Sequence, residues 1–297
     1  MALLYALAST TDLAAIGENL IRLPAAAAAW CLALFVAITI LAGLRWHLIM
    51  RAMGVELDHR SVQSLMFIGT FFNQVLPTSV GGDFVRIWHV WRTGARRQDA
   101  VIGVFAERLS GLIALVFMIA IGIGLMGEQI TNSLLRNALL AMLPLSLAGL
   151  IFLGALDRLP LFFRRWTFNK LDGLAAVTRK VFLAWPLAAQ LFGISLLGHF
   201  LSSLGLFALA QGLGVSLSLW QCLGLFPAVI LITLIPLSFA GWGIREGAMV
   251  VMLGYAGVTP VMALSLSVLL GVGFLAASLP GLVLWLLGWP REGKPAR

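Results

Sequence analysis

Charged residues are scarce in this sequence: they make up 11% of its 297 residues, whereas soluble domains carry about 25%. Hydrophobic residues supply 61%. This balance excludes an ordinary soluble domain and indicates a protein embedded in a membrane. Cysteine is rare as well. Cys31 and Cys222 lie in apolar runs without metal-ligand spacing, and we expect both to pack in a core.

Catalytic motifs are also lacking. The chain holds no H-E-x-x-H, G-x-S-x-G or G-x-x-x-x-G-K-[ST] pattern. The polar links between apolar runs are too short to hold a soluble catalytic or ATPase domain. His199 lies in an apolar run with no carboxylate or cysteine at ligand spacing, so we expect it to pack. We therefore expect no enzyme activity, no cofactor and no metal site.

Five apolar runs are long enough to cross a bilayer, which takes about 20 residues. They lie at residues 24–50, 99–126, 137–156, 181–210 and 260–288. Two shorter runs, 61–76 and 219–235, stop at Pro77 and Pro236, and proline ends a helix. We predict that they form re-entrant half-helices in an all-α, polytopic membrane protein.

Two further segments suit the membrane surface rather than its interior. Residues 1–23 are weakly amphipathic, and residues 84–97 combine Trp88 and Trp91 with four arginines. The predicted organisation has five parts. They are an interfacial segment at 1–23, a first transmembrane repeat at 24–126, a connecting span and basic cytoplasmic link at 127–180, a second transmembrane repeat at 181–290 and a basic tail at 291–297.

The formal charge of +8 could indicate a nucleic-acid partner, but the placement of the basic residues argues against one. If both short runs enter and leave on the same side, 16 of the 20 Lys and Arg residues fall on one face. Basic residues collect in cytoplasmic loops, which predicts a cytoplasmic C-terminus and an outside N-terminus in a bacterial-type inner membrane. The four basic regions are 45–60, 86–97, 157–180 and 291–297.

The stretches after the two short runs share one pattern, P-x-S-x-x-G-x-x-x-R. A shift of 159 positions aligns Pro77, Ser79, Gly82 and Arg86 with Pro236, Ser238, Gly241 and Arg245. Coincidence is the alternative, since glycine and serine abound in this chain. Three predicted crossings separate the two copies, so one copy is inverted relative to the other. Inverted repeats with broken helices around a central site are typical of secondary transporters.

Charged side chains inside the membrane cost roughly 3 kcal/mol or more at the helix centre, so their positions are informative. Arg86 and Arg245 occupy matching places just after the two turns. Helix N-termini and guanidinium groups both suit phosphate, and we predict that the two arginines face one cavity and bind a phosphate headgroup. The alternative is structural: Arg86 pairs with Asp83, and Arg245 pairs with Glu246 or Glu107.

Glu107 and Arg108 are neighbours in the second span and point about 100° apart on a helix, so each needs a partner elsewhere. We predict a structural or gating pair. Asn73 is expected to hydrogen-bond across the broken helices. The predicted substrate-binding residues are Arg86, Arg245, Asp83, Asn73, Ser79, Ser238, Gly82 and Gly241, and the predicted gating or ion-pair residues are Glu107, Arg108 and Glu246.

Three pieces of sequence form a recognisable order: N-x-x-x-P from Asn73, G-G-D-x-x-R ending at Arg86, and G-x-G-x-R-E ending at Glu246. In this order the chain resembles the lysylphosphatidylglycerol synthase transmembrane family over residues 24–288. In bifunctional members, a membrane domain moves aminoacylated phosphatidylglycerol between leaflets and a separate soluble domain makes it. The resemblance implies a stand-alone flippase-like protein without aminoacyl transfer, and stand-alone relatives are linked to several other lipids.

Three functions are consistent with these features. The first is a flippase that moves a lipid with an anionic or phosphate headgroup through a cavity between inverted repeats. The second is a membrane scaffold subunit of a lipid-synthesis system, which would use the basic link 157–180. The third is an intramembrane lipid-modifying transferase with Glu107 or Glu246 as base. The expected partner is a membrane lipid and no nucleic acid, and the large apolar surfaces leave a homodimer open.

Overall fold

The computed structural model describes residues 13–76, 80–126, 130–158, 172–234 and 243–288. Helices make up most of these residues, and no strand occurs among them. The fold is therefore all-α, as the apolar runs predict. Five residues of the repeated sequence pattern lie outside the described residues, namely Pro77, Ser79, Pro236, Ser238 and Gly241.

Five of the described helices are long and apolar enough to cross a membrane. They follow the five predicted runs, because an apolar helix satisfies its own backbone hydrogen bonds in lipid. These helices are α3 (Ala25–Ala52), α6 (Arg97–Met126), α7 (Ser133–Gly154), α10 (Leu187–Gly212) and α13 (Pro260–Leu286). The chain is thus a multi-pass membrane protein.

Four shorter helices lie between α3 and α6 and between α10 and α13. They are α4 (His59–Val75), α5 (Gly81–Arg92), α11 (Leu219–Thr233) and α12 (Ile244–Gly254). Asp58 caps the start of α4, and Ser218 forms a capping box with Gln221 at the start of α11. With 17 and 15 residues, α4 and α11 are roughly 26 and 23 Å long, which is less than the hydrocarbon thickness of a bilayer.

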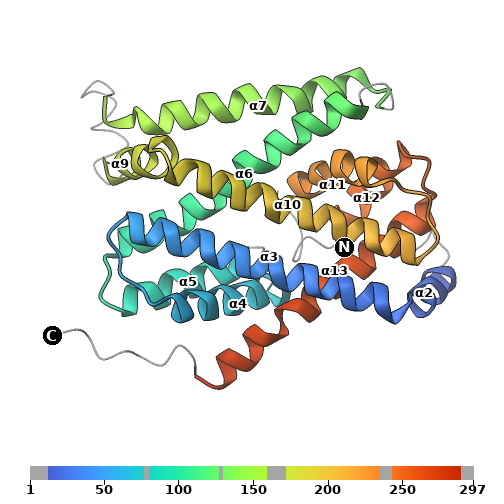
Figure 1. The fold of residues 1–297 in the computed structure, drawn as a ribbon, viewed down its shortest axis with the longest axis horizontal. Helices are drawn as coiled ribbons and strands as arrows, with labels where there is room; N and C mark the ends of the chain where they lie inside the picture. Colours follow the sequence, from blue (N-terminus) through green and yellow to red (C-terminus); the bar gives the residue numbers. More distant parts are fainter. Residues whose placement is uncertain (1–12, 77–79, 127–129, 159–171, 235–242, 289–297) are drawn as a thin grey trace.

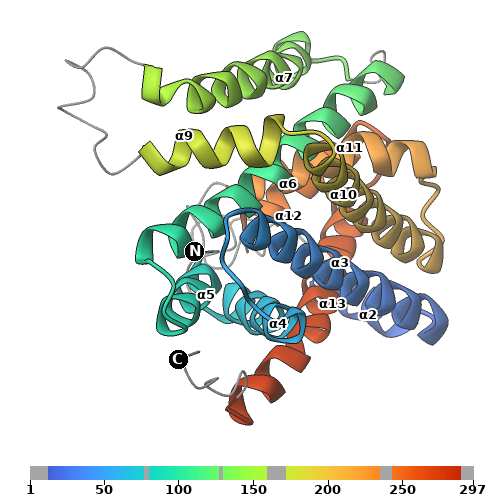
Figure 2. The same ribbon diagram turned by 60° about the vertical axis from the view of Figure 1, so that its left-hand side comes forward.

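The helices pack in matched pairs (Figures 1 and 2). α4 lies against α13, α11 lies against α6, and α3 lies beside α10. Glycine lets the α4–α13 pair and the α11–α6 pair approach closely where they cross. Any side chain at Gly281 would collide with the α4 backbone at Phe67, and any side chain at Gly122 would collide with Gly224 on α11. Gly122 and Gly281 are 159 positions apart, the same shift that aligns the repeated sequence pattern.

The remaining elements flank this bundle. α7 lies outermost in Figures 1 and 2 and is followed by η1 (Leu156–Arg158), α9 (Asp172–Thr178) and η2 (Arg179–Leu183). Arg179 donates two hydrogen bonds to Asp157, at 2.8 and 2.7 Å, and so ties η2 to the end of α7. α2 (Leu13–Arg22) packs on α13, where Asn19 donates to the Ser265 hydroxyl at 3.1 Å.

Two predicted boundaries were wrong. The interfacial helix predicted at 84–97 begins earlier, at Gly81, and ends at Arg92. The Gly-Gly pair forms its first turn, and Gly82 has to be glycine there because any side chain would collide with the Gly69 backbone on α4. Pro186 was predicted inside the fourth span, but α10 begins after it. Proline has no N–H to donate, which suits the start of a helix rather than its interior.

Candidate functional site

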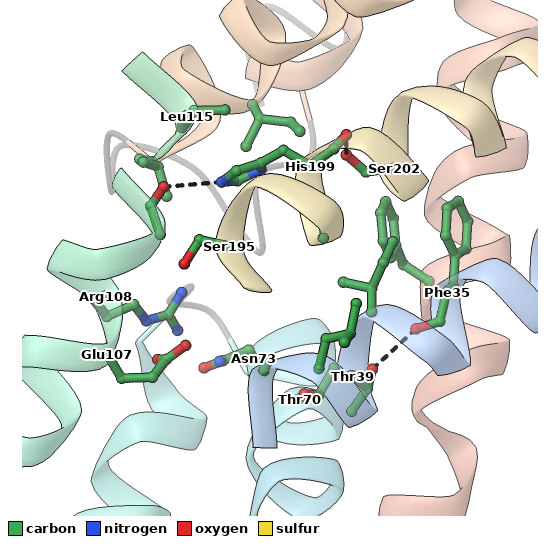
Figure 3. Close-up of a pocket in the computed structure, with 18 of the residues that line it drawn as sticks. Phe35, Thr39, Thr70, Asn73, Glu107, Arg108, Leu115, Ser195, His199 and Ser202 are labelled. Carbon is green, nitrogen blue, oxygen red and sulfur yellow. Dashed lines mark hydrogen bonds between the residues drawn. The ribbon is translucent and has the colours of Figure 1, made fainter. Parts of the chain in front are cut away.

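A cavity of about 400 Å³ lies where the two groups of matched helices meet. Its described walls come from α3, α4, α5 and α6 in the first half of the chain and from α10, α11, α12 and α13 in the second half. The walls are polar at one end, where Figure 3 shows Glu107, Arg108 and Asn73 gathered away from Phe35. A cavity of this composition suits an amphiphilic ligand.

The polar end is built around Glu107 on α6. Arg45 on α3 pairs with one of its carboxylate oxygens, and Nη1 of Arg86 on α5 lies 3.4 Å from the other. A buried carboxylate is costly unless it is paired, and two guanidinium groups from two other helices stabilise this one. Arg45 Nη1 also donates to Ser195 Oγ on α10 at 2.9 Å, so the cluster connects four helices.

Arg86 is the most buried charged side chain among the described residues, with 2% exposed. Its guanidinium lies over the Trp46 ring at 4.0 Å, and Nη1 donates to Asp83 at 3.3 Å. Asp83 in turn accepts two hydrogen bonds from Arg108, at 3.0 and 3.1 Å. The Nε and Nη2 atoms of Arg86 have no hydrogen-bond partner within the described part of the chain. Buried donors left without a partner can bind an incoming anion.

Arg245 lines the same cavity from α12. Its Nη2 donates to Glu246 at 2.9 Å, and its Nε donates to Ser267 on α13 at 3.1 Å. Ser267 closes the triangle by donating to Glu246 at 3.0 Å. Gly271 leaves the space that the guanidinium fills, since any side chain there would collide with it. Glu246 also accepts from the Gly243 amide, which fixes the first turn of α12.

Arg86 and Arg245 thus line one cavity, and each also has the carboxylate partner of the structural alternative. The two interpretations are compatible in one structure. The described residues in and directly behind the cavity wall include four arginines and three carboxylates, which give a net charge of +1. They are Arg45, Arg86, Arg108 and Arg245 against Asp83, Glu107 and Glu246.

The other predicted site residues fall into two groups. Asn73 lines the cavity, and its side-chain oxygen accepts the Gly82 amide at 2.7 Å, which joins the end of α4 to the start of α5. Glu107 and Arg108 turn to different partners, as expected of neighbours on a helix. Ser79, Ser238 and Gly241 were also predicted to bind substrate, but they lie outside the described residues.

Sequence reasoning missed three cavity residues: Arg45, Ser195 and His199. Arg45 lies seven residues before the end of α3, and a charge two turns inside an apolar helix was the available signal. His199 was predicted only to pack, but it lines the cavity, and its Nε2 lies 2.9 Å from the Gly111 carbonyl oxygen (Figure 3). Nothing in the sequence distinguishes Ser195 from the many other serines.

The apolar end of the cavity is aromatic. Phe35 on α3 and Phe274 on α13 stack with their ring centroids 3.9 Å apart. Phe226 on α11 and Leu115 on α6 also line the cavity and belong to the same hydrophobic cluster. Hydrocarbon is favourable there and a phosphate is not, so the two ends of the cavity favour opposite ends of an amphiphile.

A family model described as the lysylphosphatidylglycerol synthase TM region matches residues 1–287. No curated protein matches the chain. The family match covers both groups of helices and all of the cavity, and it agrees with the multi-pass fold. A membrane lipid-related function follows from it. The chain belongs to the lysylphosphatidylglycerol synthase transmembrane region family.

Proposed function

We propose that this protein moves a phosphate-bearing lipid between the leaflets of a bacterial-type cytoplasmic membrane. The observation that carries the proposal is the single cavity lined by both Arg86 and Arg245, one from each predicted repeat. Guanidinium groups bind phosphate through paired N–H donors, and the aromatic end accommodates hydrocarbon. The headgroup crosses inside the cavity, with the first part of the acyl chains against the aromatic end and the rest of the chains in the bilayer.

Two inverted repeats, α3 to α6 and α10 to α13, supply the alternating access in this proposal. Counterpart helices follow the same order, and the packing of α4 on α13 mirrors that of α11 on α6. In Figure 1, α3 runs from α2 at the right towards the left, whereas α10 runs from the α9 side at the left towards the right. Opposite directions of counterpart helices are what an inverted pair requires. The short α4 and α11 then act as re-entrant half-helices beside a wet cavity.

The arrangement also supports an orientation. α5, α9 and the start of α6 lie at the left in Figure 1, and they carry or adjoin the basic segments 86–97 and 157–180. Basic residues collect on the cytoplasmic side of a membrane. We infer that this end faces the cytoplasm, with a cytoplasmic C-terminus and an outside N-terminus.

In the proposed cycle, Arg86 and Arg245 bind the lipid phosphate in turn as the repeats rock. A buried charge that loses its partner is strongly destabilising, so each arginine needs a second partner for the part of the cycle without lipid. Asp83 is that partner for Arg86, and Glu246 is that partner for Arg245. The ion pairs of the structural alternative therefore become the lipid-free resting contacts.

Leaflet exchange in reconstituted vesicles tests the proposal. Fluorescent phosphatidylglycerol in the inner leaflet is protected from dithionite until the protein moves it outward. We expect Arg86→Ala and Arg245→Ala each to slow this exchange at least tenfold, because each removes a phosphate-binding guanidinium. Arg96→Ala is the control, since Arg96 lies at the surface in an ion pair with Asp99. Normal exchange by both cavity variants, with elution and melting like wild type, would eliminate the phosphate role.

A further inference from the structure

The two carboxylate oxygens of Glu107 each pair with a different arginine. Oε1 pairs with Arg45 Nη2, and Oε2 lies 3.4 Å from Arg86 Nη1. The Glu107 side chain is only 5% exposed, and it reaches this place from α6, between α3 and α5. A phosphodiester anion also presents two free oxygens and one negative charge, so it can make the same bridge between the same guanidinium groups. We call the space between the Arg45 and Arg86 guanidinium groups the phosphate seat.

Both arginines of the phosphate seat keep unused donors. Nε of Arg45, and Nε and Nη2 of Arg86, have no hydrogen-bond partner within the described ranges. Glu107 therefore satisfies the seat only in part. A phosphate in the same place has more acceptor lone pairs than a carboxylate. It can therefore accept hydrogen bonds from the arginine N–H groups that Glu107 does not reach.

Resting on the proposed function, we propose that Glu107 is a stand-in for the ligand: a lipid phosphodiester binds Arg45 and Arg86 in its place, and the displaced Glu107 takes up one proton. One O–H bond forms on the Glu107 carboxyl, and one bond to hydrogen breaks in a hydronium ion or buffer acid of the solvent, which remains as water or as the conjugate base. A carboxylate that has lost both guanidinium partners inside an apolar bundle is too costly to remain charged. Lipid binding and proton uptake are thereby coupled at one site.

The groups that the structure describes around Glu107 offer the displaced carboxylate no other unpaired cation, so we expect it to be neutralised by a proton. Among the described residues, the charged and titratable groups around it and along the cavity wall come from five helices. They are Arg45 from α3, Asp83 and Arg86 from α5, Arg108 from α6, His199 from α10, and Arg245 with its partner Glu246 from α12. Arg108 is already bonded twice to Asp83, and His199 lies against the Gly111 carbonyl. Arg245 is bonded to Glu246 and Ser267. Once the phosphate holds Arg45 and Arg86, the other described cations of the cavity wall therefore already have partners of their own.

The shared chemistry of the ligand is a phosphodiester anion, and the aromatic end of the cavity favours a lipid over a free phosphodiester. Phe35 and Phe274 give hydrocarbon a contact that a water-soluble headgroup cannot use. Dioctanoyl phosphatidylglycerol and its deacylated headgroup, glycerophosphoglycerol, separate the two sources. Neither phosphate titrates near neutral pH, so any proton taken up on binding belongs to the protein.

Isothermal titration calorimetry of the purified full chain in detergent tests the inference. Repeating the titration in buffers of different ionisation enthalpy counts the protons taken up. We expect one proton per dioctanoyl phosphatidylglycerol, and an affinity that rises about tenfold for each unit of pH decrease between pH 8 and 6. Glu107→Gln should bind at least tenfold more tightly at pH 8 and take up no proton, while Arg45→Ala should lose at least tenfold in affinity. Glycerophosphoglycerol should bind more weakly than the lipid.

The outcomes separate this inference from the proposed function. Wild-type protein that binds the lipid without proton uptake, or Glu107→Gln with wild-type affinity and proton count, overturns the stand-in role and leaves lipid movement intact. If Glu107→Gln does not fold, the wild-type proton count alone decides. Equal affinity for lipid and deacylated headgroup overturns the lipid assignment. Wild-type protein that binds no anionic lipid at any pH overturns the inference and the proposed function together. Arg96→Ala, at the exposed pair with Asp99, should match wild type throughout.

Discussion

At the scale of single residues, the cavity depends on charges that a membrane does not tolerate alone. Each buried arginine described above is held by a carboxylate, a hydroxyl or an aromatic face from another helix. Removing one partner therefore exposes the other to the full cost of desolvation. Pairing between helices makes the charge cluster a structural connection as well as the proposed binding surface.

Asn73→Ala tests a single neutral hydrogen bond between two helices of the cavity wall. Asn73 joins α4 to α5 through the Gly82 amide at 2.7 Å, and the substitution leaves that amide without its acceptor. We expect a loss of about 1 kcal/mol in stability, visible as a lower melting temperature in detergent. Asn73→Asp keeps an acceptor oxygen in place and should melt closer to wild type. Equal melting of Asn73→Ala and wild type would show that the bond contributes nothing.

The sequence was informative about some of these residues and not about others. Arg86 and Arg245 were recognisable because they occur at matching places after proline-stopped runs. Arg45 was counted only as part of the basic region 45–60, because charge close to a membrane boundary is ordinary. Ser195 was not predictable, since its role comes from the side-by-side packing of α3 and α10, which no local pattern encodes.

At the scale of helices, close crossings made by glycine hold the two halves together. The α6–α11 crossing at Gly122 and the α13–α4 crossing at Gly281 lie at equivalent places in the chain. Apolar burial adds little between helices in lipid, so close backbone packing contributes much of the association. The helices themselves were largely predictable, because the length of each apolar run sets the approximate limits of its helix. Their crossings were not, because close approach depends on a glycine in the partner helix.

Gly122→Ala tests this packing against a matched glycine on the same helix. The new methyl group would collide with Gly224, so α6 and α11 must separate, at a cost of about 1–3 kcal/mol. Gly124→Ala places the same methyl group two residues further on, with nothing within 4 Å. We expect a lower melting temperature for Gly122→Ala and no loss for Gly124→Ala. Similar melting of the two variants would refute the close crossing.

The Asp157–Arg179 pair predicts a pH dependence outside the membrane spans. The two hydrogen bonds from Arg179 lower the pKa of Asp157 below its usual range. Stability from a carboxyl with a lowered pKa is present above its unfolded-state pKa and is lost as the pH falls through the folded-state value. We expect backbone amides of η1 and η2 to exchange faster as the pH falls below about 4, after correction for intrinsic rates. Asp157→Asn should already show fast exchange at pH 7, and pH-independent exchange in both proteins would contradict this.

At the scale of the whole molecule, the central claim is that two half-units share one cavity and that lipid phosphate passes through it. Net positive charge at one end and aromatic carbon at the other suit a single amphiphile better than a free ion or a pure hydrocarbon. The half-units differ in charge. Arg86 has two carboxylate partners, Asp83 and Glu107. Arg245 has one carboxylate partner, Glu246, and the hydroxyl of Ser267. In the proposed cycle, we expect this difference to give the two sides unequal affinity for the phosphate.

Cysteine accessibility tests the central claim most directly. Thr70 on α4 and Thr233 on α11 both line the cavity, and each hydroxyl donates to a backbone carbonyl of its own helix, so cysteine is a mild replacement. Each would be introduced singly into a chain whose Cys31 and Cys222 are replaced by alanine. We predict that a charged, membrane-impermeant thiol reagent modifies both positions and that dioctanoyl phosphatidylglycerol protects both. Modification of both positions without any protection, while the lipid still binds elsewhere on the protein, would contradict the account.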